Sequence, residues 1–156
     1  MSTNARRKLV LDIRKLNREP NQEGMIIKPL DNDIMIWDAL IFGQEDTIWE
    51  GGIFRLSIKF TEEYPTQPPE VRFQSPIYHP NVYQNGKICL DILDKQWSPL
   101  YDAQAILTSI RSLLIDPNPD SPANPEAAKL FTSDMKTYNE KVKNIVEQSW
   151  VFEPEQ

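Results

Sequence analysis

The sequence has 156 residues, 40% of them apolar and 26% charged, which is ordinary for one globular domain. The net charge of −6 disfavours direct binding to nucleic acid, and a single cysteine cannot form an internal disulfide. No apolar run approaches the roughly 18–20 residues that cross a bilayer or follows the first basic residues as in a secretory signal. We therefore expect a protein of the cytoplasm and nucleus that binds neither nucleic acid nor membrane directly.

The predicted elements begin with a helix and four strands. Apolar residues at helical spacing predict a helix over residues 4–18, with Ser2 or Thr3 as N-cap and Pro20 at its end. Runs rich in Ile, Phe and Trp predict strands at residues 25–30, 34–42, 53–60 and 71–73. The polar breaks between these runs are short, which favours an antiparallel meander.

The second half of the chain predicts a long loop followed by three helices. Residues 74–101 have little periodicity and form a long irregular segment, a length of loop that is often functional. Helical periodicity returns at residues 102–115, with Asp102 as a possible N-cap, and then at 126–131 and 134–150. The order of helix, four strands, loop and three helices indicates a single α+β domain over residues 1–156.

The charge is distributed unevenly along the chain. Residues 1–18 hold six basic residues and one acid, a net charge of +5, which leaves −11 for the remainder. Such a dipolar chain suits docking to proteins with complementary patches, and a solvated helix face is the alternative interpretation.

The only cysteine and the only histidine, Cys89 and His79, lie ten residues apart inside the predicted loop. The surrounding run reads His79-Pro80-Asn81-Val82-Tyr83, then Gly86-Lys87-Ile88-Cys89-Leu90-Asp91, then Trp97-Ser98-Pro99. A thiol among turn residues, an amide, a phenol and a carboxylate indicates a reaction site. The alternative is a buried cysteine that acts as a small hydrophobic residue.

This run resembles the active-site motif of ubiquitin-conjugating enzymes, in which a His-Pro-Asn segment closely precedes the cysteine that carries ubiquitin as a thioester. The resemblance extends over the chain through residues 49–54 (WEGGIF), 64–69 (YPTQPP) and 99–101 (PLY). Within the family, residues 121–124 (SPAN) and 145–150 (IVEQSW) are similar to the radiation-sensitivity branch, which implies histone ubiquitination and DNA-damage tolerance.

The resemblance implies roles for the residues of the loop. Cys89 accepts ubiquitin from the activating enzyme and passes it to a substrate lysine. Asn81 stabilises the oxyanion or orders the loop, and Tyr83, Asp91 and the Asp120-Ser121 pair are candidates for positioning the lysine. His79 and Pro80 are structural, and Trp97 packs under the loop. A thiol hydrolase with His79 as base for Cys89 is the alternative.

The resemblance also implies partners and two turn conformations. Arg6, Arg7, Thr66, Ser98, Pro99 and Leu100 form the surface for the activating enzyme and RING-type ligases, with Leu100 as an exposed apolar anchor. No cofactor or metal is expected, since the activating enzyme uses the ATP. Tyr64-Pro65 is expected to be a cis peptide, and Asp46 can adopt the left-handed conformation in a turn where the family often has Pro and Gly.

Two alternatives remain open at this point. One is the same chemistry with another ubiquitin-like modifier, and the other is a non-catalytic variant that only binds ubiquitin or a partner.

Overall fold

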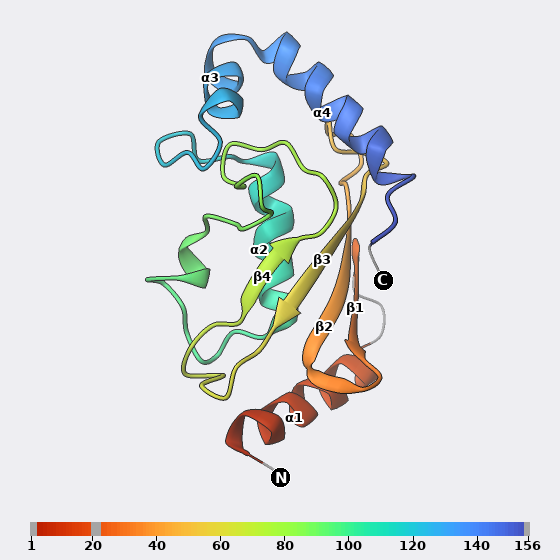
Figure 1. Cartoon of the computed structure of the whole chain (residues 1–156), viewed down its shortest axis with the longest axis vertical. Helices are drawn as coiled ribbons and strands as arrows, with labels where there is room; N and C mark the ends of the chain where they lie inside the picture. Colours follow the sequence, from red (N-terminus) through yellow and green to blue (C-terminus); the bar gives the residue numbers. More distant parts are fainter. Residues whose placement is uncertain (1–2, 20–22, 155–156) are drawn as a thin grey trace.

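The computed structural model describes residues 3–19 and 23–154 (Figure 1). The elements follow in the order α1 (Asn4–Arg18), β1 (Met25–Leu30), β2 (Asp33–Phe42), β3 (Ile53–Lys59), β4 (Glu70–Phe73), η1 (Asp91–Leu93), α2 (Ala103–Ile115), α3 (Pro125–Ser133) and α4 (Met135–Ser149). The predicted α+β order is confirmed, and the element that the sequence prediction lacked is the short 3₁₀ helix η1.

Each of the four α-helices follows an N-cap residue whose side-chain oxygen accepts a backbone N–H of the first turn. Thr3 caps α1 and Asp102 caps α2, both as predicted, while Asn124 caps α3 and Asp134 caps α4. The other predictions at the ends of α1 concern Ser2 and Pro20, which lie outside the described residues. The caps fix where each helix starts and therefore where the loops between them run.

The four strands form the predicted antiparallel meander, in the order β1-β2-β3-β4. Its register pairs Ile41 with Phe54 and Trp37 with Ile58, so these side chains share one face of the sheet. That face is buried against the apolar side of α2, which contributes Ile106, Leu107, Ile110 and Leu114 to the same core. Each such buried side chain stabilises the fold by about 1.5–3 kcal/mol.

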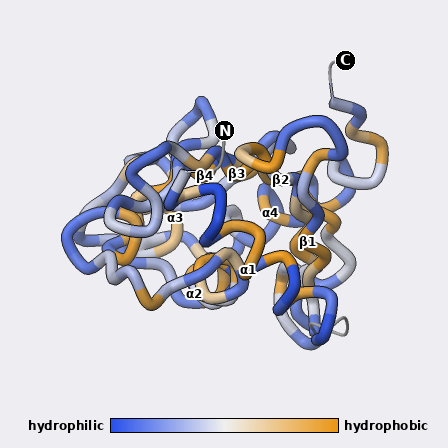
Figure 2. The backbone as a smooth tube through the Cα atoms, turned by 90° about the horizontal axis from the view of Figure 1, so that it is seen from below, coloured by the Kyte–Doolittle hydropathy of each residue, from blue (hydrophilic) through white to orange (hydrophobic). Residues whose placement is uncertain are grey.

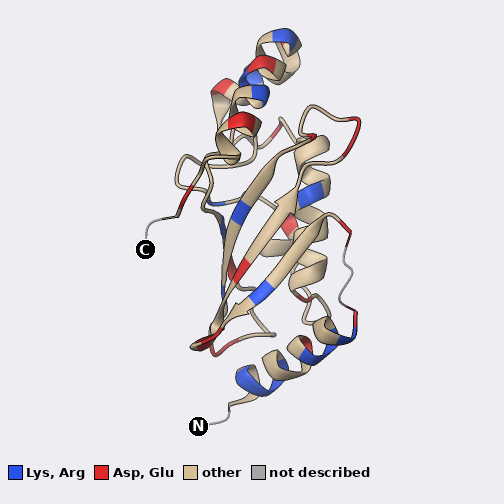
Figure 3. Ribbon diagram, turned by 90° about the vertical axis from the view of Figure 1, so that its right-hand side faces the viewer, with Lys and Arg blue, Asp and Glu red and all other residues tan. Residues whose placement is uncertain are grey.

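Helix α1 lies across one end of the sheet, while α3 and α4 lie at the other end (Figure 1). Apolar and polar stretches alternate along α1 (Figure 2), and its Ala5 and Leu9 are fully buried in the core. Lysines and arginines lie along α1 (Figure 3), and Arg7, Arg14, Lys15 and Arg18 are exposed. The basic N-terminal segment is thus an amphipathic helix with a cationic outer surface.

Asp12 of α1 is buried and ties the helix to the loop after β3. Its carboxylate accepts a hydrogen bond from the Tyr64 hydroxyl at 2.6 Å and pairs with the ammonium of Lys8. Burial first, and then this carboxylate, raise the pKa of Tyr64 far above its usual range. The Tyr64 hydroxyl therefore stays a donor and holds the two segments together.

Both predicted turn conformations are confirmed. The Tyr64-Pro65 peptide is cis, and Asp46 has a φ of 62°, in the left-handed region that aspartate tolerates better than most residues. A third turn, at Gly86, requires glycine for two reasons: its φ is +88°, and a Cβ there would lie 2.1 Å from the carbonyl oxygen of Phe73. This close approach joins the end of β4 to the loop that carries Cys89.

Candidate active site

Within the loop over residues 74–101, residues 81–89 form a hairpin whose two halves are joined by backbone hydrogen bonds. The N–H of Cys89 donates to the carbonyl of Asn81 at 2.8 Å, and a bridge pairs Val82 with Ile88. The reversal between these halves is a turn in which Gly86 N–H donates to the carbonyl of Tyr83. This turn places the segment that follows His79 beside the segment that contains Cys89.

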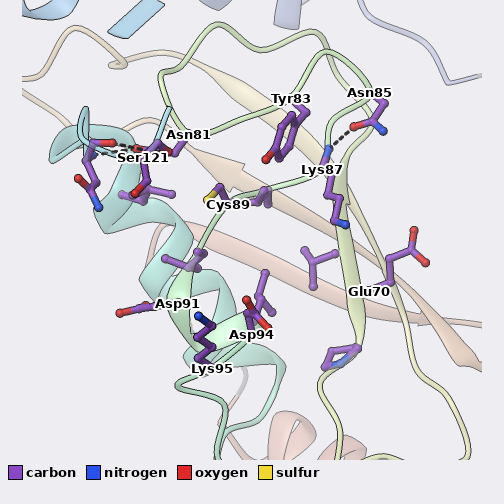
Figure 4. A pocket seen from close by; sticks show the side chains of 17 residues that line it. Glu70, Asn81, Tyr83, Asn85, Lys87, Cys89, Asp91, Asp94, Lys95 and Ser121 are labelled. Carbon is purple, nitrogen blue, oxygen red and sulfur yellow. Dashed lines mark hydrogen bonds between the residues drawn. The ribbon is translucent and has the colours of Figure 1, made fainter. Parts of the chain in front are cut away.

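Cys89 is a free cysteine with an exposed side chain, so the alternative of a buried hydrophobic cysteine is wrong. It lines a groove of about 960 Å³ (Figure 4). The groove is also lined by the predicted site residues Asn81, Tyr83, Asp91 and Ser121 and by Glu70, Asn85, Lys87, Leu90, Asp94, Lys95 and Asn118, among others. The fold therefore brings together an accessible thiol, an amide, a phenol, a carboxylate and a hydroxyl.

His79 is fully buried, and both nitrogens of its imidazole are engaged. Nε2 lies 2.7 Å from the carbonyl oxygen of Leu113, and Nδ1 accepts the N–H of Asn81 at 3.0 Å. This arrangement needs the neutral tautomer with the proton on Nε2. Burial lowers the pKa of His79 to about 4. A ring with no free nitrogen is not available as a base for Cys89, so the geometry opposes the thiol-hydrolase interpretation and favours a structural role.

Acidification is expected to destabilise the protein through His79. Its pKa is lowered in the folded state, so the unfolded chain, with a pKa of about 6.5, binds the proton first. The stability due to neutral His79 is therefore complete above pH about 6.5 and is lost as the pH falls toward 4, by about 3 kcal/mol in all.

Urea unfolding between pH 7 and pH 4.5 measures this loss, with His79→Gln as the variant that cannot titrate. The wild type should lose more stability than the variant over this range. The chain has one histidine, so its ring resonances can be followed directly by NMR. A folded-state titration near pH 6.5 would contradict the expectation.

The Asn81 side chain is almost fully buried and links the loop to the segment after α2. Its Nδ2 donates to the carbonyl of Asn118 at 2.7 Å and to that of Ser121 at 3.3 Å, while its Oδ1 accepts the N–H of Asn118 at 2.8 Å. The adjacent carbonyl of Pro80 accepts the N–H groups of Ala123 and Asn124. These contacts are those of a loop-ordering residue, and an oxyanion role requires one of the two donors to be exchanged.

The other predicted site residues differ in how they are held. Tyr83 is 44% exposed, and Asp91 begins η1 with its side chain in solvent. Ser121 is exposed beside Asn81, whereas Asp120 does not line the groove. Tyr83, Asp91 and Ser121 therefore surround the thiol from three segments, and Asp120 lies outside the lining (Figure 4).

A comparison with known proteins decides the family. The family model described as ubiquitin-conjugating enzyme matches residues 8–146. This chain belongs to the ubiquitin-conjugating enzyme family. It is 58% identical over 151 residues to "Ubiquitin-conjugating enzyme E2 3" of Arabidopsis thaliana, covering 97% of this chain and 100% of that protein. It is 52% identical over 151 residues to "Ubiquitin-conjugating enzyme E2 1" of Caenorhabditis elegans, covering 97% and 78%.

These matches confirm the predicted activity and fold: the protein is a ubiquitin-conjugating enzyme with the α+β fold of that family. The family acts with ubiquitin, an activating enzyme and a ligase, so these are its partners in general terms. Within the described parts of the chain, no helix is long and apolar enough to cross a membrane. The same parts contain no cluster of three or more potential metal ligands.

Trp97 of this conjugating enzyme joins the loop after η1 to the loop after β3. Its indole N–H donates to the carbonyl of Pro65 at 2.9 Å, and its ring contacts those of Tyr64 and Tyr101. These contacts make Trp97 a tether between two loops, and its packing under the loop that carries Cys89 stays a prediction. Thr66 directly follows Pro65 in the chain, and Ser98 directly follows Trp97, so the two predicted partner residues lie next to the two ends of this tether.

The predicted partner surface of the conjugating enzyme is exposed. Leu100 is 92% exposed, an unusual position for a leucine, and Pro99 and Thr66 are also exposed. On α1, Arg7 is exposed, and the half-buried Arg6 lies 3.7 Å from a carboxylate oxygen of Glu62. An exposed leucine near one end of a tether between two loops has the character of a docking surface.

Sequence reasoning missed six polar residues of the groove: Glu70, Asn85, Lys87, Asp94, Lys95 and Asn118. Lys87 could have been found, because residues 86–91 alternate polar and apolar side chains, which predicts an extended segment with Lys87, Cys89 and Asp91 on one face. Asn118 has no such signal, since its contact with Asn81 spans 37 residues.

Proposed function

We propose that Cys89 is the residue on which this conjugating enzyme carries ubiquitin. The observation that supports the proposal is an exposed thiol, the only one in the sequence, which lines a groove and whose backbone is held by a hydrogen bond to Asn81. The Cys89 thiolate attacks the thioester carbonyl of ubiquitin on the activating enzyme. A new C–S bond forms, the old one breaks, and the activating enzyme's thiolate leaves. One thioester replaces another, so no strong base is needed beside the cysteine.

The second step is attack by the uncharged amine of a substrate lysine on the same carbonyl. A C–N bond forms, the C–S bond to Cys89 breaks, the amine loses a proton, and Cys89 is released as the thiolate. The transition state carries charge on the carbonyl oxygen, for which the amide of Asn81 is the proposed donor. Tyr83, Asp91 and Ser121 position the amine, since they line the groove around the thiol.

The partner surface leads us to propose a RING-type ligase. Leu100, Pro99 and Ser98 with Thr66 provide the apolar anchor and its rim, and Arg6 and Arg7 of α1 extend the surface for the activating enzyme. The net charge of +5 in residues 1–18 supports docking on an acidic partner.

The stretches at residues 121–124 and 145–150 support membership of the radiation-sensitivity branch of the family. DNA repair with a histone substrate, in the nucleus as well as the cytoplasm, would follow from that membership. Ubiquitination of nucleosomes with a panel of ligases tests the assignment, and transfer to free lysine without any transfer to histones would oppose it.

One assay tests the proposed function. The protein is incubated with activating enzyme, ATP and ubiquitin, and in parallel with other ubiquitin-like modifiers and their own activating enzymes. An adduct that disappears with reductant should form with ubiquitin alone. An adduct with another modifier in preference would favour the alternative that the sequence left open.

Ser121→Asp is expected to speed discharge of ubiquitin to free lysine by about two- to fivefold, the scale of an exposed charge interaction. Ser121 is exposed and lines the groove, so a carboxylate there attracts the lysine ammonium to the thioester. The same charge also favours the protonated amine, but positioning dominates when lysine is dilute. Single-turnover discharge of wild type, Ser121→Asp and Ser121→Ala is compared, and equal rates from pH 7 to 9 would contradict this expectation.

A further inference from the structure

The groove is larger than one lysine side chain needs. Its volume of about 960 Å³ is at the upper end of pockets that enclose whole small molecules. From Ser121 it passes Cys89 and extends over Lys87 to Glu70 on β4 (Figure 4). The extension beyond the thiol therefore has room for residues next to the acceptor lysine in the substrate chain.

Lys87, Cys89 and Asp91 stand in a row along this groove. All three are exposed, while Ile88 is buried and Leu90 half-buried between them, the alternation of an extended chain. Alternate side chains of an extended segment are about 6.6 Å apart. A cation thus lies on one side of the thiol and a carboxylate on the other, each at the spacing of alternate residues in an extended peptide.

The backbone of Lys87 is fixed by hydrogen bonds, while its ammonium group forms no ion pair with any residue that the structure describes. Its N–H donates to Oδ1 of Asn85 at 3.0 Å, and its carbonyl accepts the N–H of Tyr83 at 2.9 Å. Among the described residues, no carboxylate lies within 4.0 Å of the Lys87 ammonium, whereas Arg72 opposite it pairs with Glu70. Like charges opposite one another destabilise paired strands. Lys87 therefore stands opposite Arg72 at some cost in stability. Of these two charges, Arg72 is the one that pairs with a carboxylate of the described residues.

We propose that Lys87 binds a carboxylate of the substrate two residues from the acceptor lysine, and so directs this enzyme to lysines with an acidic neighbour. An extended substrate segment that places its lysine at Cys89 brings the residue two positions away over Lys87. This inference rests on the proposed function of Cys89 and adds a specificity-determining residue to it.

The test measures charging and discharge separately. Wild-type enzyme, Lys87→Glu and Lys87→Gln are charged with ubiquitin and then chased with short peptides that contain one lysine. The peptides carry Glu, Gln or Arg two residues before or two residues after the lysine. Lys143→Glu is the matched control, because Lys143 is exposed on α4 and does not line the groove.

The wild type should discharge about threefold faster to the Glu peptide than to the Gln peptide at low salt, the scale of an exposed ion pair. In Lys87→Glu the preference should reverse, changing the ratio of Glu to Arg peptide rates by about tenfold. Lys87→Gln should show little preference, Lys143→Glu should behave as wild type, and 0.5 M salt should reduce all preferences.

Two results would overturn the inference. One is a wild type that treats the three peptides alike, and the other is a Lys87→Glu enzyme that slows all of them equally, which would assign Lys87 to the ubiquitin tail or to the fold. A wild type that does not charge at all would instead overturn the proposed function, and this inference with it.

Discussion

Cys89→Ser is expected to lose every reductant-sensitive adduct with ubiquitin and to form an oxyester more slowly in its place. A serine hydroxyl is a weak nucleophile unless a base activates it, and both ring nitrogens of His79 are engaged elsewhere. Loading should therefore slow by about 10²- to 10⁴-fold, the contribution that general-base assistance makes where it exists. The oxyester, once formed, is less activated than a thioester and should resist lysine.

The measurement is a gel of the loading reaction with and without thiol reductant, for wild type, Cys89→Ser and Cys89→Ala. The serine adduct should survive reductant but be cleaved by mild alkali, which separates it from an isopeptide bond on a lysine of the enzyme. The alanine variant should form neither. Reductant-sensitive charging of Cys89→Ser would remove Cys89 from the mechanism.

Most of the fold could be predicted because its elements carry a strong period. In β3, apolar and polar residues alternate from Phe54 on, and the observed Ile53–Lys59 differs from the prediction by Phe60 alone. Helix α2 begins at the predicted cap, Asp102. The helix η1 was missed because three residues are too few to show a period. Helix α3 begins and ends outside the predicted 126–131, since its cap is Asn124 and Pro125 suits the first turn.

The candidate site could be predicted in its residues but not in its contacts. A local motif and the family resemblance were enough to single out Cys89 and Asn81. The bonds of Asn81 to the backbone of Asn118 and Ser121 depend on where α2 ends and how the following loop returns, which no local pattern encodes. The same holds for the indole of Trp97 and the carbonyl of Pro65, 32 residues apart.

Asn81→Ala is expected to slow discharge to lysine by about 10²-fold or more, the usual effect of a lost oxyanion donor, and to slow loading less. In the resting structure both donors of the amide are engaged. The bond to Ser121, at 3.3 Å, is longer than the 2.9–3.0 Å that such bonds prefer, so this N–H is the one that can turn to the oxyanion at least cost.

The alanine variant also leaves the N–H and carbonyl of Asn118 without their partner, which by itself destabilises the loop by about 1–3 kcal/mol. A second variant separates the two effects. Asn118→Ala removes the bond from its own side chain to the N–H of Asp120 and loosens the same loop, but it leaves the Asn81 amide in place. It should slow discharge only a few-fold if the amide acts on the oxyanion.

Single-turnover loading and discharge are measured for wild type and both variants, together with their urea unfolding. A discharge defect that is large in Asn81→Ala and small in Asn118→Ala supports the oxyanion donor. If loading and discharge fall equally in Asn81→Ala, or if Asn118→Ala reproduces the full defect, Asn81 acts by ordering the loop. In that case the three bonds to residues 118–121 account for its whole contribution, because they hold one wall of the groove in place for both reactions.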